Sequence, residues 1–263
     1  MSYQSSWQEK VKRLPDEIFH RLEKTNNPQA STQRALLIGQ GVKLFLPGLN
    51  NFISTPEWKL FISQAEPCHK DTDIKPDHLE ALKSNPIYLK GDSISHITSF
   101  PSGTFDLIIS LWDLPAQTQD NGSYAKNIHR LLKKKGQFCI FTYIDGSPEL
   151  PLNIIKKIIE RNKLPLKIFK SALPDSPKSL RRILSKADFG DVRIWKDDIT
   201  CTYQSSEDLL NDIFSDNEKS LFMDNTTIEQ RLIIREEFVK DIREHSFPLK
   251  ISYDFSGGVG VKP

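Results

Sequence analysis

Two short apolar runs with a helical pattern between them constrain the fold more than any other feature of this sequence. The first run, at residues 105–111 (FDLIISL), is apolar at nearly every position and follows Pro101-Ser102-Gly103. Such a run is typical of a strand that is covered on both faces, and hence of a parallel sheet. The second run, at residues 138–143 (FCIFTY), comes about thirty residues later. Strand, helix and strand in this spacing predict a βαβ crossover.

The rest of the chain also alternates between strand-like and helix-like segments. Further strands are expected at residues 35–38, 58–63, 87–89, 192–195, 200–203 and 249–255. Helices are expected at residues 5–23, 42–52, 77–84, 124–132, 152–162, 179–187, 207–214 and 228–244. We predict that Ser123 caps the helix between the two apolar runs, and that the lysines at 133–135 with Gly136 end it. The alternation predicts one doubly wound α/β domain.

Composition argues against several kinds of partner. The 263 residues carry a net charge of +2, which gives no independent reason to expect nucleic acid or an anionic membrane as a partner. No segment reaches the ~18 apolar residues that a membrane span needs, and the first residues are too polar for a secretory signal. Cys68, Cys139 and Cys201 are scattered, so we expect neither a disulfide framework nor a zinc site. A cytoplasmic protein is expected.

Familiar catalytic motifs are missing from the sequence. It contains no GxSxG, HExxH or CxxC motif and no kinase signature, so hydrolase, zinc-enzyme and kinase functions have no support. The six histidines show no metal-ligand spacing, and His129 is expected on the polar face of its helix. Gly257-Gly258-Val259-Gly260 resembles a phosphate loop in composition alone, because no helix with the required lysine follows it. We expect a turn there, beside the last strand.

Three segments resemble the class I S-adenosylmethionine-dependent methyltransferases. Gly91-Asp92, Phe100-Pro101 and residues 103–110 resemble the family's "GD … lPF … gsFDlvis" segment. Residues 131–136 resemble its "vLkpGG" turn, and residues 179–195 its "lrrlLeeAGFrdVri" ending. The resemblance covers about residues 34 to 196. It implies a Rossmann-like, mostly parallel, seven-stranded sheet and S-adenosylmethionine as cofactor.

The domain organisation follows from this resemblance. We expect a single methyltransferase-like domain over residues 1–263, with N-terminal helices at 1–33 and the core at 34–196. A helical insertion is expected at 205–247 and the final strand at 248–263. The N-terminal helices and the insertion are expected to form a lid over the substrate pocket.

A glycine pair at the end of the first strand is the first candidate for cofactor binding. In a doubly wound sheet the ligand lies beyond the carboxyl ends of the strands, where the strand order reverses. Gly39 and Gly41 stand there, and glycine lets the backbone approach a ligand, although many βα turns contain glycine for backbone reasons alone. The family has an acidic residue and a third glycine where this chain has Leu37 and Lys43.

The resemblance implies roles for further residues at strand ends. Glu66 would accept hydrogen bonds from both ribose hydroxyls, and Asp92 would accept one from the adenine amino group. The backbone of Ser93 would meet the adenine ring, and Ser110 would line the cavity beside the transferred methyl group. A solvated strand-end acid at Glu66 and a local turn cap at Asp92 are the structural alternatives.

Trp112 and Asp113 follow the expected strand at 105–111, where substrate-facing residues usually lie in this family. Trp112 would stack on the substrate and Asp113 would orient it. Packing of the tryptophan and capping of the next turn by the aspartate are the alternatives.

Two functions from different classes remain open, and a third possibility is that the pocket holds another nucleoside-type ligand. The first is a methyltransferase that transfers a methyl group from S-adenosylmethionine to a small-molecule acceptor. The second is a catalytically inactive methyltransferase-like domain that serves as a binding or scaffold protein for a protein partner. Leu37 and Lys43 favour the inactive domain, whereas Glu66 and Asp92 favour the enzyme.

Overall fold

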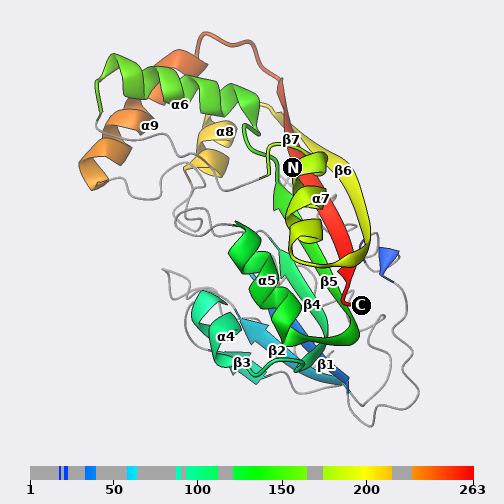
Figure 1. The fold of residues 1–263 in the computed structure, drawn as a ribbon. Coiled ribbons are helices and arrows are strands. Elements are labelled where there is room, and N and C mark those ends of the chain that lie inside the picture. Colours follow the sequence, from blue (N-terminus) through cyan, green and yellow to red (C-terminus); the bar gives the residue numbers. More distant parts are fainter. Residues whose placement is uncertain are drawn as a thin grey trace. The chain divides into compact units, whose positions relative to one another are not determined.

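The structure is a computed structural model of the chain. It describes residues 18, 21–22, 33–39, 58–63, 87–89, 93–111, 121–164, 174–214 and 227–263. The elements in these residues (Figure 1) are β1 (Gln33–Ile38), β2 (Trp58–Ser63), β3 (Ile87–Leu89), α4 (Ser93–Ser99), β4 (Phe105–Leu111), α5 (Asn121–Leu131), β5 (Leu132–Tyr143), α6 (Glu149–Arg161), α7 (Pro177–Lys186), β6 (Gly190–Tyr203), α8 (Ser206–Ile213), α9 (Ile228–Ile242) and β7 (Leu249–Val261).

The seven strands form one mixed sheet in the order β3-β2-β1-β4-β5-β7-β6. Strands β1 to β5 pair in parallel, and β7 runs antiparallel to β5. The predicted doubly wound, mostly parallel, seven-stranded sheet is therefore confirmed. From β1 the chain builds outward to β2 and β3, then returns to add β4 and β5 on the other side of β1. This reversal puts the topological switch point between β1 and β4.

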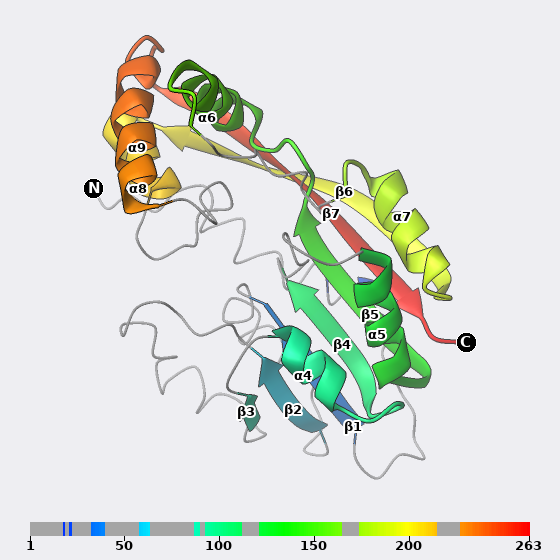
Figure 2. The same ribbon diagram turned by 60° about the vertical axis from the view of Figure 1, so that its left-hand side comes forward.

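Strand β4 lies in the middle of the sheet and is buried at all seven positions. This explains its nearly continuous apolar sequence, because a central strand of a parallel sheet is covered on both faces. Helices α4, α5 and α7 contribute to one hydrophobic core with β1, β4 and β5, and Figure 2 shows α4 and α5 lying along the sheet. The buried residues of this core include Leu36, Ile108, Ile128 and Leu180.

The predicted bounds of β2, β3 and β4 are confirmed, whereas the other four strands differ from expectation. Strand β5 begins at Leu132, six residues before its predicted start, and β7 ends at Val261, six residues after its predicted end. Strand β1 begins at Gln33, two residues before the predicted start. Residues 190–203 form a single strand, β6, where two separate strands were predicted. Residues 196–198, between the two predicted strands, are all charged. Because β6 is the last strand in the order, an edge position allows it to carry charged side chains on an exposed face.

The prediction for the end of α5 is wrong. The helix begins at Asn121, so Ser123 lies inside it, and it ends at Leu131, so Gly136 belongs to β5. The carbonyls at its end accept hydrogen bonds from distant segments: Gly103 N donates to Arg130 O at 3.0 Å, and Lys262 Nζ donates to Leu132 O at 2.7 Å. These hydrogen bonds satisfy the carbonyl oxygens at the end of the helix in place of a glycine cap.

The prediction of a turn at Gly257-Gly258-Val259-Gly260 is also wrong, because this segment lies within β7. It pairs antiparallel with β5, with Gly257 opposite Phe141. A Cβ on Gly258 would lie 2.8 Å from Ile194 Cδ1, and one on Gly260 would lie 2.9 Å from Phe189 Cβ. The glycines therefore leave room for side chains that pack against the sheet.

His129 is predicted on the polar face of its helix, but part of its ring is buried. Its ring meets Phe189 edge to face, with 5.1 Å between the ring centroids. Within the described part of the chain its Nε2 is buried and has no hydrogen-bond partner. Burial, followed by the nearby Lys262 ammonium group, lowers the pKa of His129, although Asp188 acts in the opposite direction.

The lowered pKa of His129 predicts a loss of stability on mild acidification. An unfolded histidine takes up a proton near pH ~6.5, whereas folded His129 resists protonation until the pH is lower. The free energy of unfolding should therefore fall as the pH drops from 7.5 to 5.5. Urea unfolding at the two pH values tests this. His129→Leu should show a smaller decrease, and an unchanged decrease would contradict the assignment.

The chain divides into two compact units, which are described separately. The sheet unit comprises residues 9–145, 171–197 and 255–263, and the helical unit comprises residues 1–8, 146–170 and 198–254. Strands β6 and β7 run through both units. The helical unit contains α8 and α9, which lie in the expected insertion at 205–247, together with α6 from the expected core.

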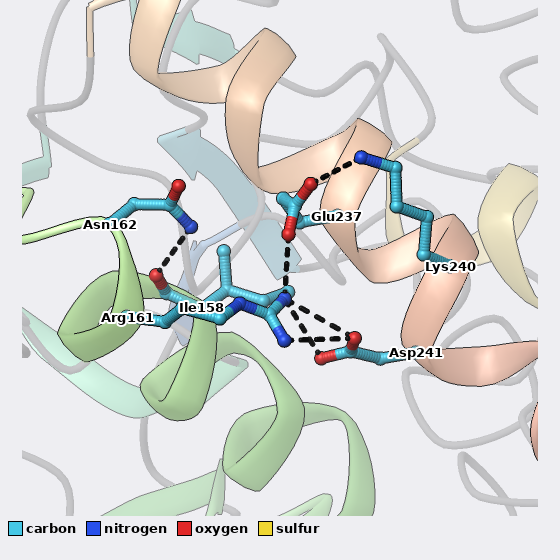
Figure 3. A network of polar contacts seen from close by, with 6 residues as sticks. All are labelled: Ile158, Arg161, Asn162, Glu237, Lys240 and Asp241. Atoms are coloured by element: carbon cyan, nitrogen blue, oxygen red, sulfur yellow. Dashed lines mark hydrogen bonds and ion pairs between the residues drawn. The ribbon is translucent and has the colours of Figure 1, made fainter.

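Helices α6 and α9 of the helical unit meet through both apolar and charged side chains. Buried Ile158 of α6 and buried Ile234 and Phe238 of α9 belong to the apolar interior. At the surface, Arg161 donates to Glu237 at 2.8 Å and to Asp241 at 3.2 Å, as Figure 3 shows. Exposed ion pairs of this kind contribute little to stability, so apolar packing holds the two helices together.

Candidate functional site

The carboxyl ends of the central strands are aligned at the switch point. In the β-sheet register, Ile38 of β1 is opposite Ser63 of β2 and Ser110 of β4. Ser110 is in turn opposite Ile140 of β5. The carboxyl ends of β1, β2 and β4 therefore share one edge of the sheet, which is where doubly wound folds bind their ligands.

Gly39 is the first residue after β1. It is buried and has a φ of 110°, a left-handed conformation that side chains with a Cβ rarely adopt. Glycine is thus required here by the backbone, and Gly39 itself contributes no side chain at the switch point. Gly39 lies at the expected place, while its role in binding a cofactor stays a prediction.

Ser110 is fully buried at the penultimate position of β4. Its Oγ lies 2.9 Å from the Oη of Tyr124, which comes from the first half of α5 and is 2% exposed. The two hydroxyls hold the end of β4 against α5. Sequence reasoning placed Tyr124 on the apolar face of its helix and missed this contact. A tyrosine among aliphatic residues was the available signal, because a buried tyrosine hydroxyl usually needs a partner.

Leu37 is fully buried in β1. Its neighbours in the sheet register are Ile62 of β2 and Ile109 of β4. A side chain in this row packs as an ordinary core residue and offers no hydrogen-bonding group to a ligand. Where the methyltransferase pattern has an acidic residue, this chain therefore has a side chain that packs in the core.

Most of the other predicted site residues lie outside the described part of the chain. This holds for Gly41, Lys43, Glu66, Asp92, Trp112 and Asp113. Ser93 is the first residue of α4, and its side chain is not described. The structure thus brings Gly39 and Ser110 to one edge of the sheet, and the roles given to the remaining residues stay predictions.

The described part of this edge carries little charge. Among the described residues within two positions of the carboxyl ends of β1 to β5, Asp145 is the single charged residue, and it is exposed. Other side chains at the end of β5 are aromatic or carry a hydroxyl. Tyr143 lies 4.7 Å from Phe255 between ring centroids, and Phe141 stacks on the same ring at 5.1 Å. No group of His, Cys, Asp and Glu in the described residues is suited to hold a metal ion.

Comparisons with solved structures agree with this topology. The chain superimposes on loganic acid methyltransferase with S-adenosylhomocysteine at a TM-score of 0.61 and 10% identity, over 98% of this chain and 94% of that one. The chain has the class I methyltransferase fold. No protein-family model and no curated protein matches the sequence.

Two further solved structures show how widely this fold is used. Haemonchus contortus phosphoethanolamine N-methyltransferase 2 with S-adenosyl-L-methionine matches at a TM-score of 0.51 and 15% identity, over 95% of this chain. The chain spans about half of that protein, 52% of its length. The cyclase SpnF matches at a TM-score of 0.52 and 15% identity, over 100% of this chain and 84% of that one. At such identities the match shows the fold, and function must be argued from the site.

None of the helices in the described residues has the length and apolar character that crossing a membrane requires.

Proposed function

We propose that the protein is an S-adenosylmethionine-dependent methyltransferase that acts on a small-molecule acceptor. The observation that carries this proposal is the left-handed Gly39 at the switch point between β1 and β4. Solved structures of the same fold, loganic acid methyltransferase and the Haemonchus contortus enzyme, hold S-adenosylhomocysteine or S-adenosyl-L-methionine. No nucleic-acid or membrane partner is part of the proposal.

The residues proposed for the site suit the cofactor in their chemistry. S-adenosylmethionine carries a methyl group on a cationic sulfonium, which is already activated toward a nucleophile. The protein therefore has to bind, orient and desolvate the reactants, and a dedicated catalytic base is not required. In this proposal Gly39 and Gly41 let the backbone approach the cofactor. Glu66 and Asp92 bind its ribose and adenine, with the backbone of Ser93 beside the ring.

The acceptor side of the proposed site lies at the ends of β4 and β5. Ser110 fixes the end of β4 through its contact with Tyr124, and Trp112 and Asp113 follow directly in the sequence. We propose that Trp112 and Asp113 contact the acceptor.

Calorimetric titration with S-adenosylmethionine and S-adenosylhomocysteine tests the proposed function. We expect a Kd on the order of micromolar for at least one of them. Glu66→Ala and Asp92→Ala should each weaken binding about 10-fold or more, because each removes hydrogen bonds to a charged acceptor. Glu236→Ala is the control, since Glu236 is an exposed acid in the middle of α9. Its affinity should equal that of the wild type.

The second candidate function is an inactive methyltransferase-like domain that binds a protein partner. The full burial of Leu37 favours it, because the family's acidic residue at this position has no substitute there. The likeness to a cyclase shows that other reactions also use the fold. If neither ligand gives binding heat with a folded sample, the methyltransferase proposal is excluded and the inactive domain is favoured.

We also propose a cytoplasmic location. Cys139 and Cys201 are both buried, Cys139 is a free thiol, and burial raises its pKa to about 12. Thiols in this state are typical of small core residues in a reducing compartment.

A further inference from the structure

The hydroxyl of Thr142 is buried and has no evident structural role in the fold. The residue is 0% exposed, and within the described part of the chain no group forms a hydrogen bond with its Oγ1. Buried side-chain hydroxyls are paired in the large majority of cases, so an unpaired one requires an explanation. Ser110, fully buried on the neighbouring strand, shows the usual behaviour through its 2.9 Å contact with Tyr124.

The β-sheet register puts Thr142 one row beyond the end of β4. Leu111, the last residue of β4, is opposite Phe141, so the next row of β5 contains Thr142. On its other side Thr142 is opposite Ser256 of β7. Among the described residues, no strand covers Thr142 on the side of β4. This stretch of β5 therefore extends past its neighbour at the carboxyl edge, where the fold binds ligands.

The strand order also indicates which ligand Thr142 would meet. Most of the proposed cofactor residues follow β1, β2 and β3, with Ser110 at the end of β4, whereas β5 lies two strands from β1 on the other side. At a strand spacing of ~4.8 Å, this separates Thr142 from β1 by about 10 Å. A small acceptor next to the transferred methyl group falls on the β4 and β5 side. Thr142 shares its sheet face with Ile140, and hence with Ser110.

We propose that the Thr142 hydroxyl binds the methyl acceptor by a hydrogen bond to an uncharged hydroxyl or carbonyl oxygen. The inference rests on the proposed methyltransferase function and names the class of acceptor. A threonine hydroxyl both donates and accepts hydrogen bonds, so it suits either oxygen. Thr142 is fully buried, and a charged acceptor group there would need a paired charge that a hydroxyl does not supply.

The first test is the thermal stability of the ligand-free protein. Thr142→Val removes the hydroxyl and keeps the branched shape, so the melting temperature should rise by about 2 °C or more. Thr142→Ser keeps the hydroxyl and serves as the matched variant, which should not show this rise. A clear fall in the melting temperature of Thr142→Val would mean that the hydroxyl is satisfied within the protein, and would overturn the proposal.

The second test measures binding of two small probes in the presence of S-adenosylhomocysteine. Benzyl alcohol carries a hydroxyl, and toluene is the matched apolar probe. In ligand-observed NMR titrations we expect the wild type and Thr142→Ser to prefer benzyl alcohol by roughly 5-fold, which is the size of one net hydrogen bond. Thr142→Val should bind both probes equally. An unchanged preference in Thr142→Val would overturn the proposal.

Calorimetry separates this inference from the proposed function. The Kd of Thr142→Val for S-adenosylhomocysteine should lie within about 2-fold of the wild-type value. Loss of a hydrogen bond to the cofactor itself would raise the Kd by more than this. A larger loss would place Thr142 at the cofactor and contradict the inference while supporting the methyltransferase. Absence of S-adenosylhomocysteine binding in the wild type would defeat the proposed function and, with it, the assignment to an acceptor.

Discussion

Gly257→Ala is expected to lower the free energy of unfolding by about 3 kcal/mol, at the upper end for overpacked cores. A Cβ at this position would lie 2.0 Å from Cε2 and 2.2 Å from Cζ2 of Trp195. An indole ring is rigid and has few alternative rotamers, so the strand or the whole side chain must move. The Arg21 guanidinium lies over the same ring, 4.7 Å from its centroid, and restricts that movement. Urea unfolding measures the loss.

A double-mutant cycle identifies the cause of this loss. In a Trp195→Ala background the added methyl group meets no ring, so Gly257→Ala should cost much less than in the wild type. An equal cost in both backgrounds would exclude the clash with Trp195. Gly103→Ala is the matched control, because a Cβ there has nothing within 4 Å. Its left-handed φ of 67° predicts a loss of about 1 kcal/mol from backbone strain alone.

Asp106→Ala is expected to lower the free energy of unfolding by about 2 kcal/mol. The carboxylate accepts hydrogen bonds from the backbone N of Arg34 at 2.9 Å and from Lys133 Nζ at 2.8 Å. It joins β1, β4 and β5 at the start of the sheet. The side chain is 12% exposed, so its removal leaves the backbone N–H of Arg34 without its partner at a site with little access to water. Chemical unfolding of the purified variant tests this expectation.

Lys133→Met separates the ion pair from the backbone hydrogen bond. The Lys133 side chain is 36% exposed, and partly solvated ion pairs of this kind contribute less than ~1 kcal/mol. Lys133→Met should therefore cost clearly less than Asp106→Ala, since Asp106 keeps its bond to Arg34. Equal losses in the two variants would assign the stabilisation to the ion pair instead.

Sequence reasoning succeeded where structure follows from local pattern. The bounds of β2, β3 and β4 match the apolar runs residue by residue. These strands lie next to one another or to β1 within the parallel part of the sheet. Strand β4 is buried on both faces, which leaves a continuous apolar run in the sequence, so the pattern is sufficient to assign it. The resemblance to class I methyltransferases supplied the mostly parallel, seven-stranded sheet, whereas the order of its strands came from the structure.

The same reasoning failed where long-range contacts decide the structure. Glycine is typical of turns, and the composition of residues 257–260 therefore predicted one. In the structure these glycines are strand residues, because Trp195, Ile194 and Phe189 occupy the space of the missing side chains. The sequence offers no local sign of those neighbours.

The candidate site was predictable in part for similar reasons. The position of Gly39 followed from the end of an apolar strand, and the structure shows its left-handed φ. The pairing of Ser110 with Tyr124 and the unpaired hydroxyl of Thr142 were not predicted. Both depend on which residues become neighbours when β4, β5 and α5 pack together.

The sequence by itself determined the alternation of strands and helices, the central buried strands and the glycine turn after β1. These features depend on the apolar character of residues that are close together in the sequence, so they can be predicted from the sequence itself. Tertiary structure alone decided where α5 ends, that β6 is continuous and that β7 needs its glycines. The end of α5 depends on Lys262, which lies 130 residues from the carbonyl oxygen of Leu132 that it binds. Contacts at such separations form in the folded chain, and no local pattern records them.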